Sequence, residues 1–214
     1  MKRNDIIREH DEQAAEYDQQ IFQYGWFAPE ALFGMSFEFV NPHDRLLDVG
    51  IGTGLGSLPF AKAGLEVFGI DGSMEMLKIC RSKNFAEDLK QFDLQNLPLP
   101  YSDGFFDHVI SSGIFHFFGD LEPICKEISR IIKPEGIFAF TIAALEETAD
   151  CNQEDYSERL RNGVPEFMHG NRYIQKLLQD SGFNRLKVLK FLVWSGQEDD
   201  DDLYHAYVTQ RFGV

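Results

Sequence analysis

The chain carries Leu46-Leu47-Asp48-Val49-Gly50-Ile51-Gly52-Thr53-Gly54, a short apolar run that leads directly into three glycines at alternate positions. The apolar run predicts a buried strand. Glycines after it let the backbone turn sharply and let a ligand approach without a Cβ in the way. The first N–H groups of a following helix would face the same ligand. This stretch therefore predicts a strand, a ligand-binding turn and a helix, in that order.

The spacing of these glycines argues against two other nucleotide-binding loops. A dinucleotide fingerprint, Gly-x-Gly-x-x-Gly, would need a glycine at Leu55, Ser57 or Pro59, depending on which glycine begins it. A Walker loop would need a Gly-Lys-Ser/Thr sequence, which does not follow. Asp48 would repel a pyrophosphate and would suit a ligand with a positive charge. A nicotinamide oxidoreductase is therefore disfavoured.

Two further carboxylates follow neighbouring apolar runs. Asp71 ends the next run, and Asp93 follows a weaker one. A carboxylate at the end of a strand can accept two hydrogen bonds from a ribose diol, and we predict this role for Asp71. Its alternative is to cap the next helix, although Ser73 is also suited to that. Asp93 could accept from the amino group of an adenine or could be an ordinary turn residue.

From Arg45 onward, short apolar runs alternate with amphipathic segments. The runs predict strands at Arg45–Val49, Glu66–Ile70, Leu89–Phe92, Phe106–Ser111 and Gly136–Ala143. The amphipathic segments predict helices at Leu55–Ala63, Ser73–Arg81 and Leu121–Ile132, with Ser73 and Asp120 as N-caps. This alternation indicates βαβ units around a parallel sheet that is covered on both faces.

The two ends of the chain differ from this core. The first 40 residues predict helices, with Pro29 in the first turn of one over Ala28–Val40. After a helix at Asn171–Ser181, two longer runs at Asn184–Ser195 and Leu203–Arg211 predict an antiparallel hairpin at the sheet edge. We expect one domain over 1–214, divided into a helical cover at 1–44, a cofactor-binding core at 45–144, a lid-like insertion at 145–170 and a C-terminal helix and hairpin at 171–214.

Composition limits the classes of partner. Twenty basic and thirty-five acidic side chains give a net charge of −15, which disfavours nucleic acid and an anionic membrane. The sequence has no apolar run of roughly 18 residues, as a membrane span needs, and its polar start lacks a secretory segment. Cys80, Cys125 and Cys151 form no Cys-x-x-Cys pair, so we expect buried thiols in a reduced cytoplasm. Oligomeric state is not predicted.

Together these features resemble the class I S-adenosylmethionine-dependent methyltransferases, in particular those that act on metabolites. The resemblance covers about Asp11 to Gly182 and rests on these stretches: Ala14–Asp18, Leu46–Gly54, Gly69–Leu77, Phe92–Leu94, Phe106–Ser112, Phe115-His116 and Ile131–Gly136. It implies a Rossmann-like, seven-stranded, mostly parallel sheet with helices on both faces and an antiparallel C-terminal edge hairpin. One departure is Pro134-Glu135-Gly136, where the family commonly has Pro-Gly-Gly.

The resemblance also implies which residues hold the methionine part of S-adenosylmethionine. Gly50, Ile51 and Gly52 would line it. Asp48 would lie near its ammonium group, and Ser111, at the end of the fourth predicted strand, would lie beside it.

A second set would hold the adenosine part. Asp71 would bind the ribose hydroxyls, with Gly72 and Met76 against the ribose and adenine. Asp93 would accept from the adenine amino group, and the Leu94 backbone would contact a ring nitrogen.

The transfer itself needs position and a dry site more than a catalytic group, because the cofactor supplies the reactivity. His116 is the candidate for a general base or substrate contact, with packing among phenylalanines as its alternative. Tyr17, Tyr24 and Trp26 are candidates to close the site by ring contacts with the sulfonium, or else pack as helix residues.

We therefore predict an S-adenosylmethionine-dependent methyltransferase with a small-molecule acceptor. Three alternatives remain: a non-catalytic cofactor-binding protein, an aminopropyl transferase and a nicotinamide oxidoreductase. No metal is expected, because the histidines show no i, i+4 pairing and Asp199–Asp202 lacks the glycine and glutamate of an EF-hand loop.

Overall fold

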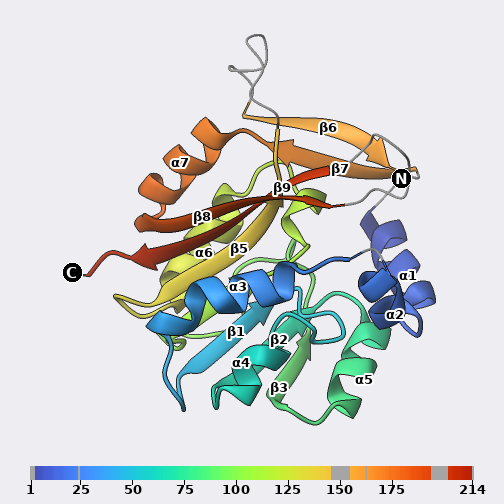
Figure 1. Cartoon of the computed structure of the whole chain (residues 1–214), viewed down its shortest axis with the longest axis horizontal. Coiled ribbons are helices and arrows are strands. Elements are labelled where there is room, and N and C mark those ends of the chain that lie inside the picture. Colours follow the sequence, from blue (N-terminus) through green and yellow to red (C-terminus); the bar gives the residue numbers. More distant parts are fainter. Residues whose placement is uncertain (1–2, 24, 146–154, 162, 194–201, 214) are drawn as a thin grey trace.

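The computed structural model describes residues 3–23, 25–145, 155–161, 163–193 and 202–213. Its centre is a seven-stranded sheet with the strand order β3-β2-β1-β4-β5-β9-β8 (Figure 1). The strands are β1 (Arg45–Val49), β2 (Glu66–Asp71), β3 (Ala86–Gln91), β4 (His108–Ser111), β5 (Ile137–Ala143), β8 (Phe183–Val193) and β9 (Asp202–Arg211). The first five run parallel, and β9 pairs antiparallel with both β5 and β8. The predicted fold class is confirmed.

Helices cover both faces of this sheet, because successive strand residues point to opposite sides. In β1, Leu46 and Leu47 belong to two different buried clusters. One cluster includes residues of α3 (Ala28–Ser36), α4 (Leu58–Lys62) and α5 (Met74–Ser82). The other includes residues of α6 (Glu122–Ile131) and α7 (Asn171–Asp180).

Helix starts test the predicted caps. The Ser73 hydroxyl accepts a hydrogen bond from the Met76 N–H at 3.1 Å, so the predicted cap of α5 is confirmed. The predicted cap of α6 is wrong by one residue: Leu121 holds the N-cap position, while the Asp120 carboxylate accepts from the Glu122 N–H at 2.9 Å. Helix α4 begins at Leu58, later than predicted, because residues 55–57 form a turn, with Ser57 at the N-cap position and Pro59 in the first turn of the helix.

The N-terminal cover consists of α1 (Arg3–Gln13) and α2 (Tyr17–Gln23), followed by α3 and the short 3₁₀ helix η1 (Phe37–Phe39). Pro29 lies in the first turn of α3, as predicted. Cys80 and Cys125 are buried, as predicted, whereas Cys151 and the connector between β8 and β9 (194–201) lie outside the described residues.

The insertion contains a hairpin that the sequence analysis missed. Its strands, β6 (Tyr156–Arg161) and β7 (Val164–His169), pair antiparallel in a separate two-stranded sheet. The Leu145 N–H donates to the His169 carbonyl at 3.0 Å, which ties β7 to the segment after β5. The hairpin therefore lies across the end of the main sheet at which β5 ends (Figure 1). Its role as a lid stays a prediction.

Candidate functional site

The glycine turn after β1 uses backbone conformations that favour glycine. Gly50 and Gly52 have φ angles of +78° and +53°. A Cβ on Gly50 would lie 2.9 Å from Ile114 Cγ1, whereas a Cβ on Gly52 would meet nothing within 4 Å. The Gly52 N–H donates to Asp71 Oδ2 at 2.8 Å, which joins the turn to the end of β2. The hydrogen bond to Asp71 therefore fixes the turn to the end of β2, while the space where a Gly52 Cβ would lie is open.

Asp71 is held by two loops at once. Its Oδ2 accepts from Gly52 and its Oδ1 accepts from the Ser73 N–H, each at 2.8 Å. An ionised carboxylate offers about four acceptor positions, so both oxygens can accept one more hydrogen bond. Burial raises the pKa of Asp71, while the two N–H groups act to lower it. Asp71 therefore closes the loop after β2 and still has acceptor capacity for a diol.

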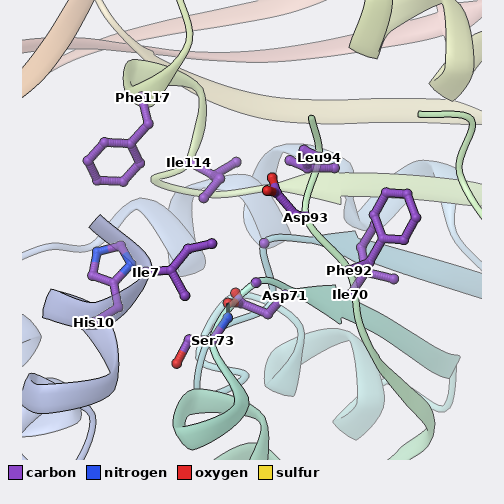
Figure 2. Close-up of a pocket in the computed structure, with 12 residues that line it drawn as sticks. Ile7, His10, Ile70, Asp71, Ser73, Phe92, Asp93, Leu94, Ile114 and Phe117 are labelled. Carbon is purple, nitrogen blue, oxygen red and sulfur yellow. Dashed lines mark hydrogen bonds between the residues drawn. The ribbon is translucent and has the colours of Figure 1, made fainter. Parts of the chain in front are cut away.

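A cavity of about 470 Å³, which includes its opening to solvent, lies beside Asp71 (Figure 2). Its walls come from α1, from the ends of β1 and β2, and from the loops after β3 and β4. It is lined by Ile7, His10, Gly50, Ile70, Asp71, Gly72, Ser73, Phe92, Asp93, Leu94, Ile114 and Phe117. Figure 2 shows Ile7 and His10 on the α1 side, facing Asp93, Leu94 and Ile114 across the cavity.

Most residues predicted for the adenosine part meet at this cavity: Gly72, Asp93 and Leu94 line it together with Asp71. Met76 is buried in α5 and is not among the lining residues. The sequence analysis missed the lining residues Ile7, His10, Phe92, Ile114 and Phe117. Phe92 lies within the Phe92–Leu94 stretch that carried the resemblance, so its position before Asp93 could have indicated it. No local signal marks Ile7 and His10, because α1 reaches the cavity only through the fold.

A second cavity, of about 360 Å³ with its opening, lies on the other side of the glycine turn. It shares Gly50 with the first and is lined by Tyr17, Ile21, Trp26, Pro29, Asp48, Gly50, Ile51, Gly52, Thr53, Leu55, Gly56 and Ser112. Ser111 lies behind this wall, since its buried hydroxyl donates to the Val49 carbonyl at 2.9 Å. The next residue, Ser112, lines the cavity in its place.

Asp48 places a buried carboxyl group in the second cavity. Its side chain is buried, and its Oδ1 has no hydrogen-bond partner among the described residues. Burial raises the pKa of Asp48 to about 7, and the negative charge of Asp71 acts in the same direction. A buried carboxylate with an unsatisfied oxygen is costly unless a cation or donor approaches it. The second cavity therefore contains a buried carboxylate that a positively charged ligand group would stabilise.

Helices α1 and α2 are joined to the rim of both cavities. Asp18 of α2 accepts from the Thr53 hydroxyl at 2.5 Å and from Lys83 Nζ at 2.6 Å. Asp11 of α1 accepts from the Ser73 hydroxyl at 2.5 Å. Burial and the nearby aspartates raise the pKa of Tyr17 to about 12, so its hydroxyl stays protonated beside Asp48. Tyr24, the other tyrosine predicted here, lies outside the described residues.

His116 lies in the 3₁₀ helix η2 (Phe115–Phe117) and is not among the residues that line either cavity. Its ring centroid is 4.1 Å from that of Phe117 and 6.3 Å from that of Tyr204. Burial lowers the pKa of His116 to about 3. A group with this pKa is a weak base at neutral pH. The predicted role of His116, as a general base or as a substrate contact, stays a prediction.

None of the described helices has the length and apolar character of a membrane span. No group of three His, Cys, Asp or Glu side chains in that part of the chain is arranged to hold a metal ion.

Comparison with known proteins assigns the class of the domain. Residues 47–140 match the family described as "Methyltransferase domain". A crystal structure of an S-adenosylmethionine-dependent methyltransferase from Methanosarcina mazei superimposes with a TM-score of 0.69 at 16% identity, over 84% of this chain and 98% of that one. Residues 47–140 thus match a methyltransferase domain and the superposition shows the same fold, both of which support the predicted class and its cofactor, S-adenosylmethionine.

Two curated relatives are similar over part of their length. The malonyl-[acyl-carrier protein] O-methyltransferase of Serratia marcescens is 33% identical over 133 residues, which are 61% of this chain and 51% of that protein. The demethylmenaquinone methyltransferase of Corynebacterium kroppenstedtii is 36% identical over 96 residues, 45% of this chain and 40% of that protein. The matches thus span about half the length of these relatives.

Proposed function

We propose that this protein transfers the methyl group of S-adenosylmethionine to a small-molecule acceptor. The observation that carries the proposal is Asp48, a buried carboxylate whose Oδ1 has no partner among the described residues and which lines a cavity. The ammonium group of the cofactor would pair with it and would remove the cost of a buried, unpaired charge.

The two cavities divide the proposed binding roles. On the Asp48 side, Gly50, Ile51 and Gly52 would line the methionine part, with Ser111 behind them. On the other side, Asp71 would accept from the ribose hydroxyls. Gly50 lines both cavities, which supports one ligand passing over the glycine turn.

The adenine end of the proposed site would be completed by the remaining predicted residues. Asp93 would accept from the amino group and the Leu94 backbone would contact a ring nitrogen, with Gly72 beside the ribose. Met76 is buried in α5, so it would support the residues that line the cavity of Asp71 from behind.

When bound, S-adenosylmethionine supplies an activated methyl group whose departure leaves a neutral thioether. This chain would hold the cofactor by Asp48 and Asp71, exclude water with α1 and α2, and align the acceptor with the methyl carbon. Alignment of two bound reactants contributes on the order of 7–11 kcal/mol to such a reaction. An acceptor that needs no deprotonation would require no general base.

A small acceptor is supported by the cover over the site. The carboxylates of Asp11 and Asp18 join α1 and α2 to Ser73 and Thr53 on the cavity rim, which restricts access to the glycine turn. The net charge of −15 also disfavours nucleic acid. One relative's name gives a malonyl group on a carrier protein with oxygen as the acceptor, and the other gives demethylmenaquinone, so together they do not fix the acceptor of this chain.

The test is calorimetric titration of S-adenosylmethionine into the wild type and Asp71→Ala, with Asp180→Ala as the control. Loss of a buried partner costs about 1–3 kcal/mol, so Asp71→Ala should weaken binding by roughly 5- to 150-fold. Asp180 is exposed at the end of α7, and its variant should bind like the wild type. If Asp71→Ala binds S-adenosylmethionine as tightly as Asp180→Ala does, Asp71 does not hold the ribose. Binding without methyl transfer to any acceptor would favour a non-catalytic cofactor-binding protein.

A further inference from the structure

The inner face of the β6–β7 hairpin is charged. Exposure alternates along β6, so that Ser157, Arg159 and Arg161 are partly buried while the residues between them are exposed. Across the hairpin, buried Glu166 pairs with Arg159, whose Nε and Nη2 lie 3.1 and 2.9 Å from Glu166 Oε2. On β7, Met168 packs against a buried cluster of the main sheet. The hairpin therefore turns two arginines toward the body of the protein.

These two arginines are used differently. Arg159 contacts two carboxylates. Its Nε and Nη2 donate to Glu166, and its Nη1 lies 2.6 Å from Asp202 Oδ1. Within the described residues, Arg161 contacts only Asp202, through Nη1. A guanidinium has five N–H donors. Most of the Arg161 donors therefore have no partner among the described residues, and its side chain is 29% exposed.

A row of aromatic rings runs from the cavity of Asp48 to Tyr204, two residues after the Asp202 that contacts Arg161. Trp26 lines that cavity, and its ring centroid is 4.9 Å from that of Tyr204. The ring of Tyr204 is in turn 6.3 Å from that of His116. The positive charges of Arg161 and Arg159 both act on His116 and on Tyr204, so these groups share one region. Since Asp202 and Tyr204 begin β9 beside the end of β5, the region lies at the edge where the glycine turn also lies.

We propose that Arg161 binds an ionised carboxylate of the methyl acceptor, which would lie along the row of Trp26, Tyr204 and His116. This inference rests on the proposed function and adds the substrate class and the acceptor atom. A carboxylate oxygen would form the new C–O bond to the methyl carbon as the S–C bond breaks, and that electron pair would remain on sulfur. The products would be a neutral methyl ester and a neutral thioether, and no proton would move.

The surroundings favour a carboxylate over other acceptors. A phenol, alcohol or ammonium group must lose a proton before or during attack, and the low pKa of His116 makes it a poor base. An ionised carboxylate needs no base. A planar carboxylate also matches the fork of a guanidinium, which can donate two parallel hydrogen bonds.

The experiment follows labelled methyl groups from S-adenosylmethionine into a metabolite extract that is divided by anion exchange at neutral pH. The wild type should transfer label to the anionic fraction, and mild alkali should release the label as methanol, because methyl esters hydrolyse there. Label that resists alkali overturns the inference but leaves the proposed function intact. An absence of transfer into every fraction contradicts the proposed function itself.

Variants then test Arg161. Arg161→Met should lower ester formation at least tenfold, mainly through a higher KM for the anionic fraction, with unchanged affinity for S-adenosylmethionine in calorimetry. It should fold, because Asp202 keeps its contact with Arg159. Arg161→Lys keeps the charge but loses the fork, so it should be intermediate. Arg185→Met, on exposed β8, is the matched control and should behave like the wild type. Wild-type rates for Arg161→Met would refute the role of Arg161.

Discussion

Replacement of Asp48 by asparagine should have opposite effects on stability and on cofactor binding. The folded-state pKa of Asp48 is about 7, against 3.8 for an unperturbed aspartate. Each pH unit of that difference corresponds to 1.36 kcal/mol, so ionised Asp48 destabilises the folded protein by about 4 kcal/mol. Asparagine has nearly the same shape and no charge. Asp48→Asn should therefore raise the free energy of unfolding by up to about 4 kcal/mol at pH 8.

The pH dependence of this effect follows from proton linkage. Between pH 3.8 and 7 the folded protein holds a proton on Asp48 that the unfolded chain has released. The contribution of Asp48 to stability therefore falls as pH rises through this window, and the full cost is present above pH 7. The difference between Asp48→Asn and the wild type should be largest at pH 8 and should vanish near pH 4.

The cofactor-binding effect has the other sign. A hydrogen bond to a charged group contributes about 1.5–3 kcal/mol, so Asp48→Asn should bind S-adenosylmethionine roughly 10- to 150-fold more weakly at pH 8. Wild-type affinity should fall from pH 8 to pH 6 as Asp48 becomes protonated, and the variant should lack this dependence. Urea unfolding and calorimetry measure the two quantities, with Asp180→Asn as the control. A variant that is less stable at pH 8, or that binds as tightly as the wild type, would refute the argument.

Two further substitutions test other parts of the argument. Glu135, in the turn before β5, has φ +65°, a conformation that costs a non-glycine residue about 1–2 kcal/mol. Glu135→Gly should therefore raise the free energy of unfolding by about 0.5–1 kcal/mol after its own entropic cost, and a decrease in urea unfolding experiments would exclude strain there. Asp18→Ala should weaken S-adenosylmethionine binding several-fold, because Thr53 loses its partner beside the glycine turn; an unchanged Kd in calorimetry would show that the cover does not support the site.

The sequence could predict the sheet, and the edge at which three carboxylates lie, for one reason. Parallel strands end at the same edge, so Asp48, Asp71 and Asp93 could be brought together from strand positions alone. The choice between Ser111 and Ser112 needed the observed pairing, because one residue along a strand reverses the side-chain direction. Neither Ile7 nor His10 could be assigned to the cavity, because that contact arises when α1 packs across the sheet edge.

The hairpin was missed for a different reason. The sequence Ser157-Glu158-Arg159-Leu160-Arg161 alternates with a period of two, as a strand should. Its inward positions are arginine rather than apolar residues, so the usual hydrophobic signal is absent. The burial of these arginines becomes understandable only with Glu166 and Asp202 in place, and Asp202 lies more than forty residues away in the chain. A local sequence pattern cannot reveal that a polar strand face is buried when the carboxylates that pair with it lie far away in the chain.

The charges of the two ends of the proposed site complement each other. Asp48 and Asp71 provide negative charge where the cationic cofactor would bind, and Arg161 provides positive charge where the anionic acceptor would bind. In the proposed reaction, the sulfonium and the carboxylate both lose their charge in one step. The ester product then no longer pairs with Arg161, and the thioether is no longer a cation that the aspartates attract. The same charges that bring the reactants together would thus favour release of the products, without any movement of a proton.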